Sequence, residues 1–497
     1  MSSLPFALFT AAQVRELDRV AIEESGIPGE TLMERAGQAA FELIQQLAPD
    51  AGRIVVMCGT GNNGGDGFIV ARLAREAGLE VSVYQVGDGT RLKGDALTAA
   101  DKLKTAGISP VPFTKKSGIN ECDVLIDAML GTGLNGKVQE PWREAIKAVN
   151  KNPAPVIALD IPSGLNADTG RIMEVAIKAQ ATISFIGLKQ GLFTADGLDC
   201  STQAFYHGLQ VPADVIMRIM PSATRLQLAP LRHLLPTRRR NTHKGSYGHV
   251  LIIGGDYGMS GAAQLAAESA MRAGAGMVTV ATRPDHVPVI TSTCPEVLCY
   301  GINNSADLRP LLKKADVIAI GPGLGQSEWA QLLLGAALET KLPLVVDADA
   351  LNLIAKEPIQ RTNWILTPHP GEAGRLLNKP TAEIQTDRFT AVRNITQQYG
   401  GVCVLKGAGT LVSGGDEPVG VCAEGNPGMA TAGMGDVLTG IIAGLLAQKP
   451  AVDSPQLAIA RLGVCVHALA GDRTALAGER GMMARDVIKG LRQIVNT

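Results

Sequence analysis

The chain has 497 residues, of which 46% are hydrophobic and 19% are charged, so it has a globular composition and is too long for one hydrophobic core. Its formal net charge of -1 argues against a non-specific nucleic-acid binder. No apolar run reaches the roughly 18 residues of a membrane span, and the N-terminus lacks the basic and apolar regions of a signal peptide. The eight cysteines include no C-x-x-C pair. We therefore expect a cytoplasmic protein with reduced thiols, at least two domains, and no nucleic-acid or membrane partner.

In the first half of the chain, short apolar runs alternate with helical stretches. A helix capped by Thr10 comes first. The strands are predicted at residues 53–58, 79–86, 123–127, 155–160 and 181–186. Continuous apolar strands that alternate with helices predict an α/β domain with a parallel sheet covered on both faces.

A second α/β series follows. Its strands are predicted at residues 249–253, 277–281, 317–320, 343–346, 364–366 and 402–405, and its last helices near 433–447, 455–470 and 484–494. Between the two series, residues 221–244 contain prolines and the basic run Arg238 to Arg240, which we interpret as a solvated linker rather than a binding patch. The predicted domains are residues 1–225 and 226–497.

Two glycine motifs follow strands of the first series. Residues 59–66 are predicted as a loop before a helix at 68–76, and residues 131–137 follow the third strand. Each contains G-x-G-x-x-G in the strand context that this fingerprint requires, which favours a phosphate-rich ligand. The second also fits G-x-x-x-x-G-K, but Val138 stands where a P-loop NTPase has Ser or Thr, so that class is rejected.

Acidic residues also end two of these strands. Asp127 and Asp160 lie where open α/β sheets place their sites, although either could be a turn or helix cap. Asp160 begins a turn that could aim Ser163 at the same crevice. Asn63, Asp127 and Ser163 offer only oxygen ligands, which suit K⁺ or Mg²⁺ rather than zinc.

The stretches 13–18, 29–37, 62–66 and 160–164 resemble the NAD(P)H-hydrate epimerase family, over about residues 10–220. The resemblance implies a Rossmann-like fold that interconverts the R and S forms of hydrated NAD(P)H. It implies that Asp160 contacts the hydrated nicotinamide and that Asn63, Asp127 and Ser163 bind K⁺. The nucleotide would be held by Asn62, Asn63, Gly64, Gly65, Asp66, Gly131, Thr132, Gly133, Leu134, Asn135, Gly136 and Lys137.

The most informative stretch of the second half runs from Asn426 to Gly440. Its small residues deliver backbone amides to the start of an apolar helix at 437–446, where the helix dipole favours phosphate. Asp436 stands at that start. It is either an ordinary acidic cap or a base that takes a proton from a hydroxyl attacking phosphorus.

The other strands of this half end in polar or glycine-rich loops, which predicts one continuous site along the sheet edge. Lys406 could neutralise phosphate charge or be a solvated surface lysine, and His369 could be structural. The loops concerned are residues 243–248, 254–256, 259–263, 321–325, 347–351, 367–372 and 406–410.

These motifs, in order, resemble the ribokinase-like NAD(P)H-hydrate dehydratase family over about residues 228–497. The resemblance implies ADP-dependent dehydration of the S form with Mg²⁺, with Asp436 at the substrate hydroxyl. Ala263, Gly323 and His369 would contact hydrated NAD(P)H. The adenine nucleotide would be bound by Lys406, Gly407, Ala408, Gly409, Thr410 and Gly435.

The whole chain therefore resembles the bacterial bifunctional NAD(P)H-hydrate repair enzymes. Its expected ligands are hydrated NADH and NADPH, ADP, AMP, Mg²⁺ and K⁺, and we expect a homo-oligomer. Two alternatives stay open. A vitamin-type kinase would release a stable phosphorylated product, and a non-catalytic dinucleotide sensor would bind NAD(P)H tightly without turnover.

Overall fold

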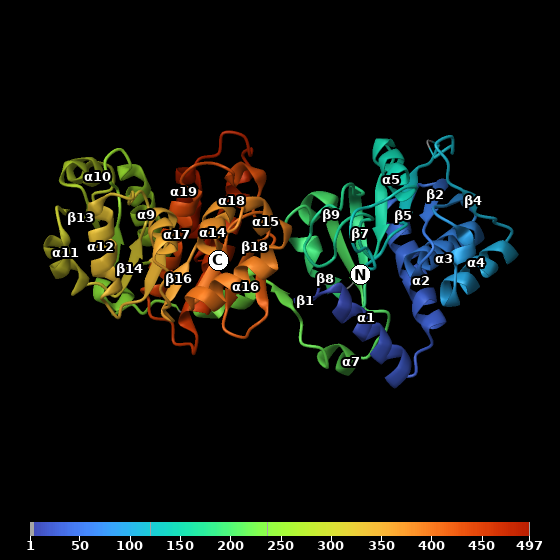
Figure 1. Ribbon diagram of the computed structural model, residues 1–497, viewed down its shortest axis with the longest axis horizontal. Helices are drawn as coiled ribbons and strands as arrows, with labels where there is room; N and C mark the ends of the chain where they lie inside the picture. Colours follow the sequence, from blue (N-terminus) through green and yellow to red (C-terminus); the bar gives the residue numbers. More distant parts are fainter. Residues whose placement is uncertain (1–3, 120, 236, 497) are drawn as a thin grey trace. The chain divides into compact units, whose positions relative to one another are not determined.

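The computed structural model describes residues 4–119, 121–235 and 237–496. The chain divides between Arg225 and Leu226 into two compact units, which are described separately. In Figure 1 unit 1 runs from blue to green and unit 2 from green to red.

Unit 1 contains a seven-stranded parallel sheet in the order β4-β3-β2-β5-β6-β7-β9. The order reverses direction between β2 and β5, as in Rossmann-like folds. Alternate residues of the central strands enter two different cores, for example Val56 in one and Val55 in the other, so both faces of the sheet are buried. The strands are β2 (Arg53–Cys58), β3 (Glu80–Gln85), β4 (Val111–Pro112), β5 (Val124–Ala128), β6 (Val156–Leu159), β7 (Ala179–Phe185) and β9 (Ser201–His207).

The helices of unit 1 are α1 (Ala11–Arg19), α2 (Gly29–Leu47), α3 (Asn62–Glu76), α4 (Gly94–Thr105), α5 (Trp142–Lys151), α6 (Gly197–Cys200) and α7 (Ala213–Met217). Thr10 caps α1 as predicted, because its hydroxyl accepts a hydrogen bond from the backbone of Gln13. A short strand β1 (Ala7–Phe9) pairs with β8 (Leu188–Lys189) and β10 (Ala223–Arg225), so it ties the beginning of the chain to the end of this unit.

Unit 2 contains parallel strands in the order β13-β12-β11-β14-β15-β16-β17, and β18 and β19 extend the edge antiparallel. The α/β class predicted for both halves is confirmed. The strands are β11 (His249–Ile253), β12 (Met277–Thr282), β13 (Leu298–Gly301), β14 (Val317–Ile320), β15 (Leu344–Val346), β16 (Trp364–Leu366), β17 (Val402–Leu405), β18 (Thr410–Gly414) and β19 (Val419–Cys422).

One face of this sheet packs against α9 (Ser260–Ala273), α17 (Met434–Leu446), α18 (Pro455–Ala475) and α19 (Ala484–Ile494) in a single core. The remaining helices are α8 (Leu228–Leu231), α10 (Val287–Thr293), α11 (Ser305–Leu312), α12 (Glu328–Leu338), α13 (Ala348–Lys356), α14 (Pro370–Leu377), α15 (Thr381–Thr386) and α16 (Arg388–Tyr399). No helix among the described residues is long and apolar enough to cross a membrane.

The predicted glycine loop at 59–66 needs a correction, because α3 already begins at Asn62. Glycines disfavour helices in isolation, so their run reads as a loop in the sequence. In the fold they let α3 approach its neighbours closely. A Cβ on Gly64 would lie 2.2 Å from the carbonyl oxygen of Gly59, and one on Gly65 would lie 2.6 Å from the sulfur of Met33. Packing therefore outweighs propensity here.

Candidate active sites

Unit 1 has a cavity of about 640 Å³ at the carboxyl ends of its strands. The segments that follow β2 and β5 form much of its wall, which is the place where a doubly wound sheet binds ligands. The residues predicted for this site that line the cavity are Asn62, Asn63, Asp66, Gly131, Thr132, Gly133, Leu134, Asn135, Lys137 and Asp160. Gly64, Gly65 and Gly136 are not among the lining residues.

A group of carboxylates surrounds one buried lysine at the floor of this cavity. Asp160 directly follows β6 with a φ of 64°, a conformation that non-glycine residues rarely adopt. Its carboxylate pairs with the ammonium of Lys189, whose side chain is fully buried. Lys189 also donates to Ser184 Oγ and to the carbonyl of Phe185, each at 3.1 Å. The lysine is therefore held in place by tertiary contacts.

Two further carboxyl groups near this pair are pushed toward their protonated forms. Burial raises the pKa of Asp18 to about 6, and the nearby charge of Asp160 adds to the shift. Burial, followed by the charges of Asp160 and Asp18, raises the pKa of Asp66 well above its usual value. A carboxylate paired with a lysine and two carboxyl groups with raised pKa values, all in one cavity, can take and give protons in the same step.

The predicted K⁺ ligands come from three segments near the carboxyl ends of the strands. Asn63 lies at the start of α3, Asp127 lies in β5, and Ser163 follows β6. Ser163 Oγ donates to Asp127 Oδ1 at 2.6 Å and accepts from the backbone of Leu130 at 2.8 Å. Burial raises the pKa of Asp127 to about 6, although its hydrogen bonds with Ser163 act in the opposite direction. Asn63 is buried, and neither polar atom of its amide has a partner among the described residues. An orphaned buried amide, a carboxylate and a hydroxyl offer oxygen ligands, which are of the kind that fits a hard monovalent or divalent cation.

In unit 2, the segment before α17 ends at Gly433, whose φ of 87° needs a glycine. The helix begins at Met434, in agreement with the helix predicted near 433–447, so its first backbone amides belong to the glycine-rich segment. Asp436 lies in the first turn. Burial raises its pKa to about 7, with the charge of Asp347 as the next cause.

Lys406 forms the centre of the charged groups around this helix start. Its ammonium donates to Asp347 Oδ1 at 2.7 Å and lies 3.8 Å from Glu372 Oε2. A Cβ on Gly435 would lie 3.1 Å from the same nitrogen, so Lys406 sits beside the start of α17. Burial opposes ionisation of Lys406, but Asp347 and Glu372 outweigh it and raise the pKa. The ammonium is therefore buried against acids and does not belong to a solvated surface lysine.

Asp347 directly follows β15 and is buried. Burial alone would raise its pKa, but Lys406 and the hydroxyl of Thr439, 2.8 Å away, hold the pKa below its usual value. Asp347 and Thr439 thus anchor α17 to the sheet edge.

A buried arginine, Arg388, holds the backbone of the segment 406–410 through hydrogen bonds to its carbonyl groups. Arg388 donates to the carbonyls of Leu405, Lys406, Ala408 and Gly409. Gly407 has a φ of 141°, and a Cβ there would lie 2.9 Å from a guanidinium nitrogen. Thr410 begins β18, and its hydroxyl donates to the carbonyl of Gly407 at 3.0 Å.

The other predicted contacts lie in neighbouring loops of the same edge. Gly323 accepts from the backbone of Asp256 at 2.6 Å, and the backbone of Gly325 donates to Asp349 at 2.9 Å. Ala263 is buried in α9, and a Cβ on Gly255 would lie 3.3 Å from it. His369 is about half exposed and caps α14 through Gly371. Glu372 connects His369 with Lys406, since its carboxylate lies 3.3 Å from the His369 ring nitrogen Nε2 and 3.8 Å from the Lys406 ammonium.

Sequence reasoning did not assign several residues that the structure brings to these sites. Asp18 and Lys189 come from elements outside the main sheet, so no strand-end pattern pointed to them. Asp347, Asp349 and Glu372 lie in the stretches 347–351 and 367–372, which were predicted as loops; Asp349 lies in α13 and Glu372 in α14, and their position after strands was a usable signal. Arg388 begins α16 and carried no such signal.

The two folds and sites define a two-unit α/β enzyme that acts on nucleotides. The profile of the NAD(P)H-hydrate dehydratase family matches residues 250–493, and the profile of the YjeF-related protein N-terminus matches residues 29–191. The chain is 48% identical to the bifunctional NAD(P)H-hydrate repair enzyme of Coxiella burnetii, over 98% of this chain and 99% of the relative. It is 41% identical to the enzyme of the same name from Escherichia coli, over 99% of this chain and 95% of that relative.

A ribokinase-like superfamily protein from Enterococcus faecalis is 30% identical, with a TM-score of 0.50 over 55% of this chain and 95% of that protein. The chain belongs to the bifunctional NAD(P)H-hydrate repair enzyme family. It is a two-domain enzyme with an epimerase half and a nucleotide-dependent dehydratase half, as the sequence motifs predicted. Neither a non-catalytic sensor nor a vitamin-type kinase agrees with this membership.

Proposed function

We propose that unit 1 inverts the hydroxylated carbon C6 of hydrated NAD(P)H in its cavity. Inversion requires one bond to C6 to be broken and remade on the other side. Loss of the hydroxyl and opening of the C6–N1 bond both need a group that gives a proton and a group that takes one. Asp160 is the proton acceptor, and the raised pKa values of Asp66 and Asp18 make these two carboxyl groups the candidates for the proton donor. Lys189 orients the Asp160 carboxylate through their ion pair.

The glycine-rich segments of the same cavity bind the rest of the dinucleotide. Backbone amides at the start of α3 suit a phosphate, and most of the residues 131–137 line the same cavity. Asn63, Asp127 and Ser163 are the residues that would hold K⁺. When bound, K⁺ would supply positive charge beside the loop that follows β5.

In unit 2, dehydration of the S form begins with transfer of the terminal phosphoryl group of ADP to the C6 hydroxyl. Asp436 takes the hydroxyl proton as the oxygen–phosphorus bond forms and AMP leaves. Backbone amides at the start of α17 and the ammonium of Lys406 stabilise charge on the phosphoryl group. The lone pair on ring nitrogen N1 then expels phosphate from C6, and loss of a proton from C5 restores NAD(P)H.

The residues at this edge also fit Mg²⁺, because Asp349 and Glu372 are hard oxygen donors beside Asp436. When bound, Mg²⁺ would neutralise phosphate charge. His369, Gly323 and Ala263 are assigned to the hydrated nicotinamide nucleotide, and residues 406–410 with Gly435 to the adenine nucleotide. The observation that carries this proposal is the position of Asp436, in the first turn of α17 and beside Lys406.

The test is incubation of the full chain with a mixture of R and S hydrated NADH, ADP, Mg²⁺ and K⁺, followed by NADH absorbance. We expect complete recovery and one AMP and one phosphate per NADH. Without K⁺, only the S fraction should be recovered quickly. A stable phosphorylated nicotinamide product, or recovery without nucleotide, would contradict the proposal. We also propose that the enzyme is cytoplasmic. We further propose that it is a homo-oligomer, which light scattering of the purified protein tests.

A further inference from the structure

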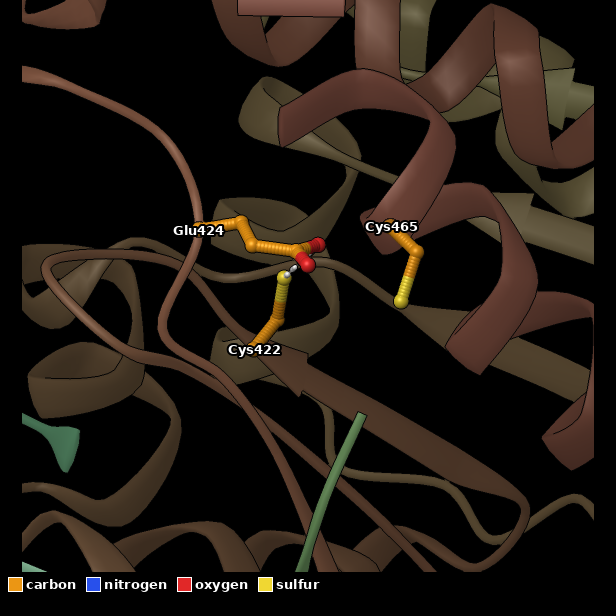
Figure 2. A group of neighbouring side chains, drawn as sticks. All are labelled: Cys422, Glu424 and Cys465. Carbon is orange, nitrogen blue, oxygen red and sulfur yellow. Dashed lines mark hydrogen bonds between the residues drawn. The ribbon is translucent and has the colours of Figure 1, made fainter. Parts of the chain in front are cut away.

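Cys422, Glu424 and Cys465 form a cluster in unit 2 that the repair chemistry does not use. Cys422 is the last residue of β19, Glu424 follows it by one intervening residue, and Cys465 lies in the middle of α18. One ligand atom from each, the two sulfurs and a carboxylate oxygen, all lie within 4.8 Å of one another. Figure 2 shows the carboxylate of Glu424 next to the sulfur of Cys422, with Cys465 facing them from its helix.

We propose that these three residues form a site for one Zn²⁺ ion. Two thiolates and a carboxylate are a donor set that zinc accepts, and a solvent molecule would complete four-coordination. Zinc–sulfur bonds of about 2.3 Å put two sulfurs of a tetrahedral site roughly 3.8 Å apart, so the observed spacing needs only a small side-chain contraction. Mg²⁺ and K⁺ prefer oxygen ligands, so this site is chemically distinct from both cation sites of the repair reactions.

The donors are held in place without a metal. Both cysteines are almost completely buried, and Cys422 Sγ contacts Glu424 Oε2 at 4.0 Å. Binding of Zn²⁺ forms two zinc–sulfur bonds and one zinc–oxygen bond and releases the two thiol protons to solvent.

The site would fix the beginning of the phosphate-binding segment. Glu424 immediately precedes Gly425 and Asn426, which receive support from Asp472: the backbone of Gly425 donates to it at 2.9 Å and the side-chain amide of Asn426 at 3.0 Å. Asp472 follows Cys465 by about two turns of α18, at 3.6 residues per turn, so both project from the same side of that helix. The metal would add a second attachment between α18 and the segment that ends at Gly433.

The test uses the full chain, reduced, freed of metal with a chelator, and then titrated with Zn²⁺ alone or with Co²⁺ as a spectroscopic substitute. We expect about one ion per chain, a thiolate-to-cobalt charge-transfer band, the visible bands of tetrahedral cobalt, and a higher melting temperature with Zn²⁺. Excess Mg²⁺ should displace neither ion.

Variants locate the site. Cys422→Ser and Cys465→Ser should each lose the charge-transfer intensity and the stabilisation by Zn²⁺. Cys403→Ser is the matched control, since Cys403 is also buried in unit 2 but contributes no atom to the cluster, and it should bind as the unchanged chain does. If either serine variant fails to fold, Glu424→Gln still tests the site. It should keep thiolate charge transfer but bind Zn²⁺ more than about tenfold more weakly.

Absence of stoichiometric uptake by the reduced chain would overturn the proposal. So would unchanged cobalt bands in Cys422→Ser, or equal loss in Cys403→Ser. Conversion of the chelated chain to a Cys422–Cys465 disulfide, with no metal uptake after reduction, would also overturn it.

Discussion

Asp436 is a carboxyl group whose surroundings oppose its ionisation. It is largely buried and faces Asp347, Asp349 and Glu372, and only Lys406 favours its charge. Its pKa of about 7 in the folded chain exceeds the ordinary aspartate value of 3.8. Between these values the folded state holds a proton that the unfolded state has lost, so stability falls as the pH rises through this interval. Above the pKa of the folded chain, Asp436 is ionised and the loss of folding stability is complete.

Asp436→Asn removes this titration. We expect the variant to gain stability relative to the unchanged chain as the pH rises from about 5 to 8, by roughly 1 to 4 kcal/mol at one to three pKa units of 1.36 kcal/mol each. Thermal unfolding of both proteins at the two pH values measures the gain. An equal difference in melting temperature at both would show that Asp436 is ionised throughout.

The same substitution should reduce ADP-dependent dehydration by about 10²- to 10⁴-fold, because a general base is lost. Epimerisation should be unchanged, since Asp436 belongs to unit 2. Separate assays with S and R hydrated NADH distinguish the two activities. Near-normal recovery of NADH from the S form would assign the base to another residue.

Asp160→Asn should have the opposite selectivity. The amide keeps a hydrogen-bond acceptor for Lys189 but cannot take a proton, so epimerisation should fall by about 10²- to 10⁴-fold. With ADP present, the S form should be consumed normally and the R form should remain, apart from its spontaneous epimerisation. Chromatographic separation of the two forms measures this. Unchanged consumption of the R form would place the acceptor at Asp18 or Asp66.

At the scale of elements, the position of the phosphate-binding helix depends on its contact with α9. Gly440 of α17 lies against that helix, where a Cβ would meet the carbonyl oxygen of Ala266 at 2.1 Å and Ser269 Oγ at 2.0 Å. Gly444, one turn later, would meet the carbonyl of Ala270 at 2.5 Å. These glycines allow the two helices to pack closely. The close packing fixes how near the first turn of α17 lies to the sheet.

Gly440→Ala should therefore destabilise the chain by about 1–3 kcal/mol and weaken ADP-dependent activity, because α17 must move. The matched control is Gly335→Ala in α12, where a Cβ has no atom within 4 Å. That exposed helical glycine should tolerate alanine and gain up to about 1 kcal/mol. Chemical unfolding of the three proteins compares them. Equal stability of Gly440→Ala and the unchanged chain would show that α9 and α17 can separate freely.

At the scale of the whole molecule, we expect the two units to work independently. Fragments 1–225 and 226–497 should fold separately, the first with epimerase activity and the second with ADP-dependent dehydratase activity, because each contains a series of parallel strands with its own core. Expression of each fragment, circular dichroism and the two assays test this. An insoluble or inactive fragment, at concentrations where the full chain works, would mean that the units support each other.

The alternation of apolar strands and helices was readable from the sequence, because a parallel sheet buried on both faces needs continuous apolar strands. The acidic strand end at Asp160 pointed to one site, since the carboxyl ends of parallel strands share one edge. The glycine-rich start of the helix that carries Asp436 pointed to the other. Family motifs then supplied the chemistry. The eight cysteines are all free thiols, as their spacing suggested.

Only the tertiary structure placed Lys189 against Asp160 and brought the free thiols of Cys422 and Cys465 close together. It also showed that the glycine-rich segment from Asn62 is helical. These contacts link residues that are distant along the chain or depend on close packing. Local propensity and periodicity describe each segment by itself, whereas burial and partner charges arise when segments pack. The raised pKa of Asp436 could be known only from the packed structure, because it comes from burial and from carboxylates of other segments.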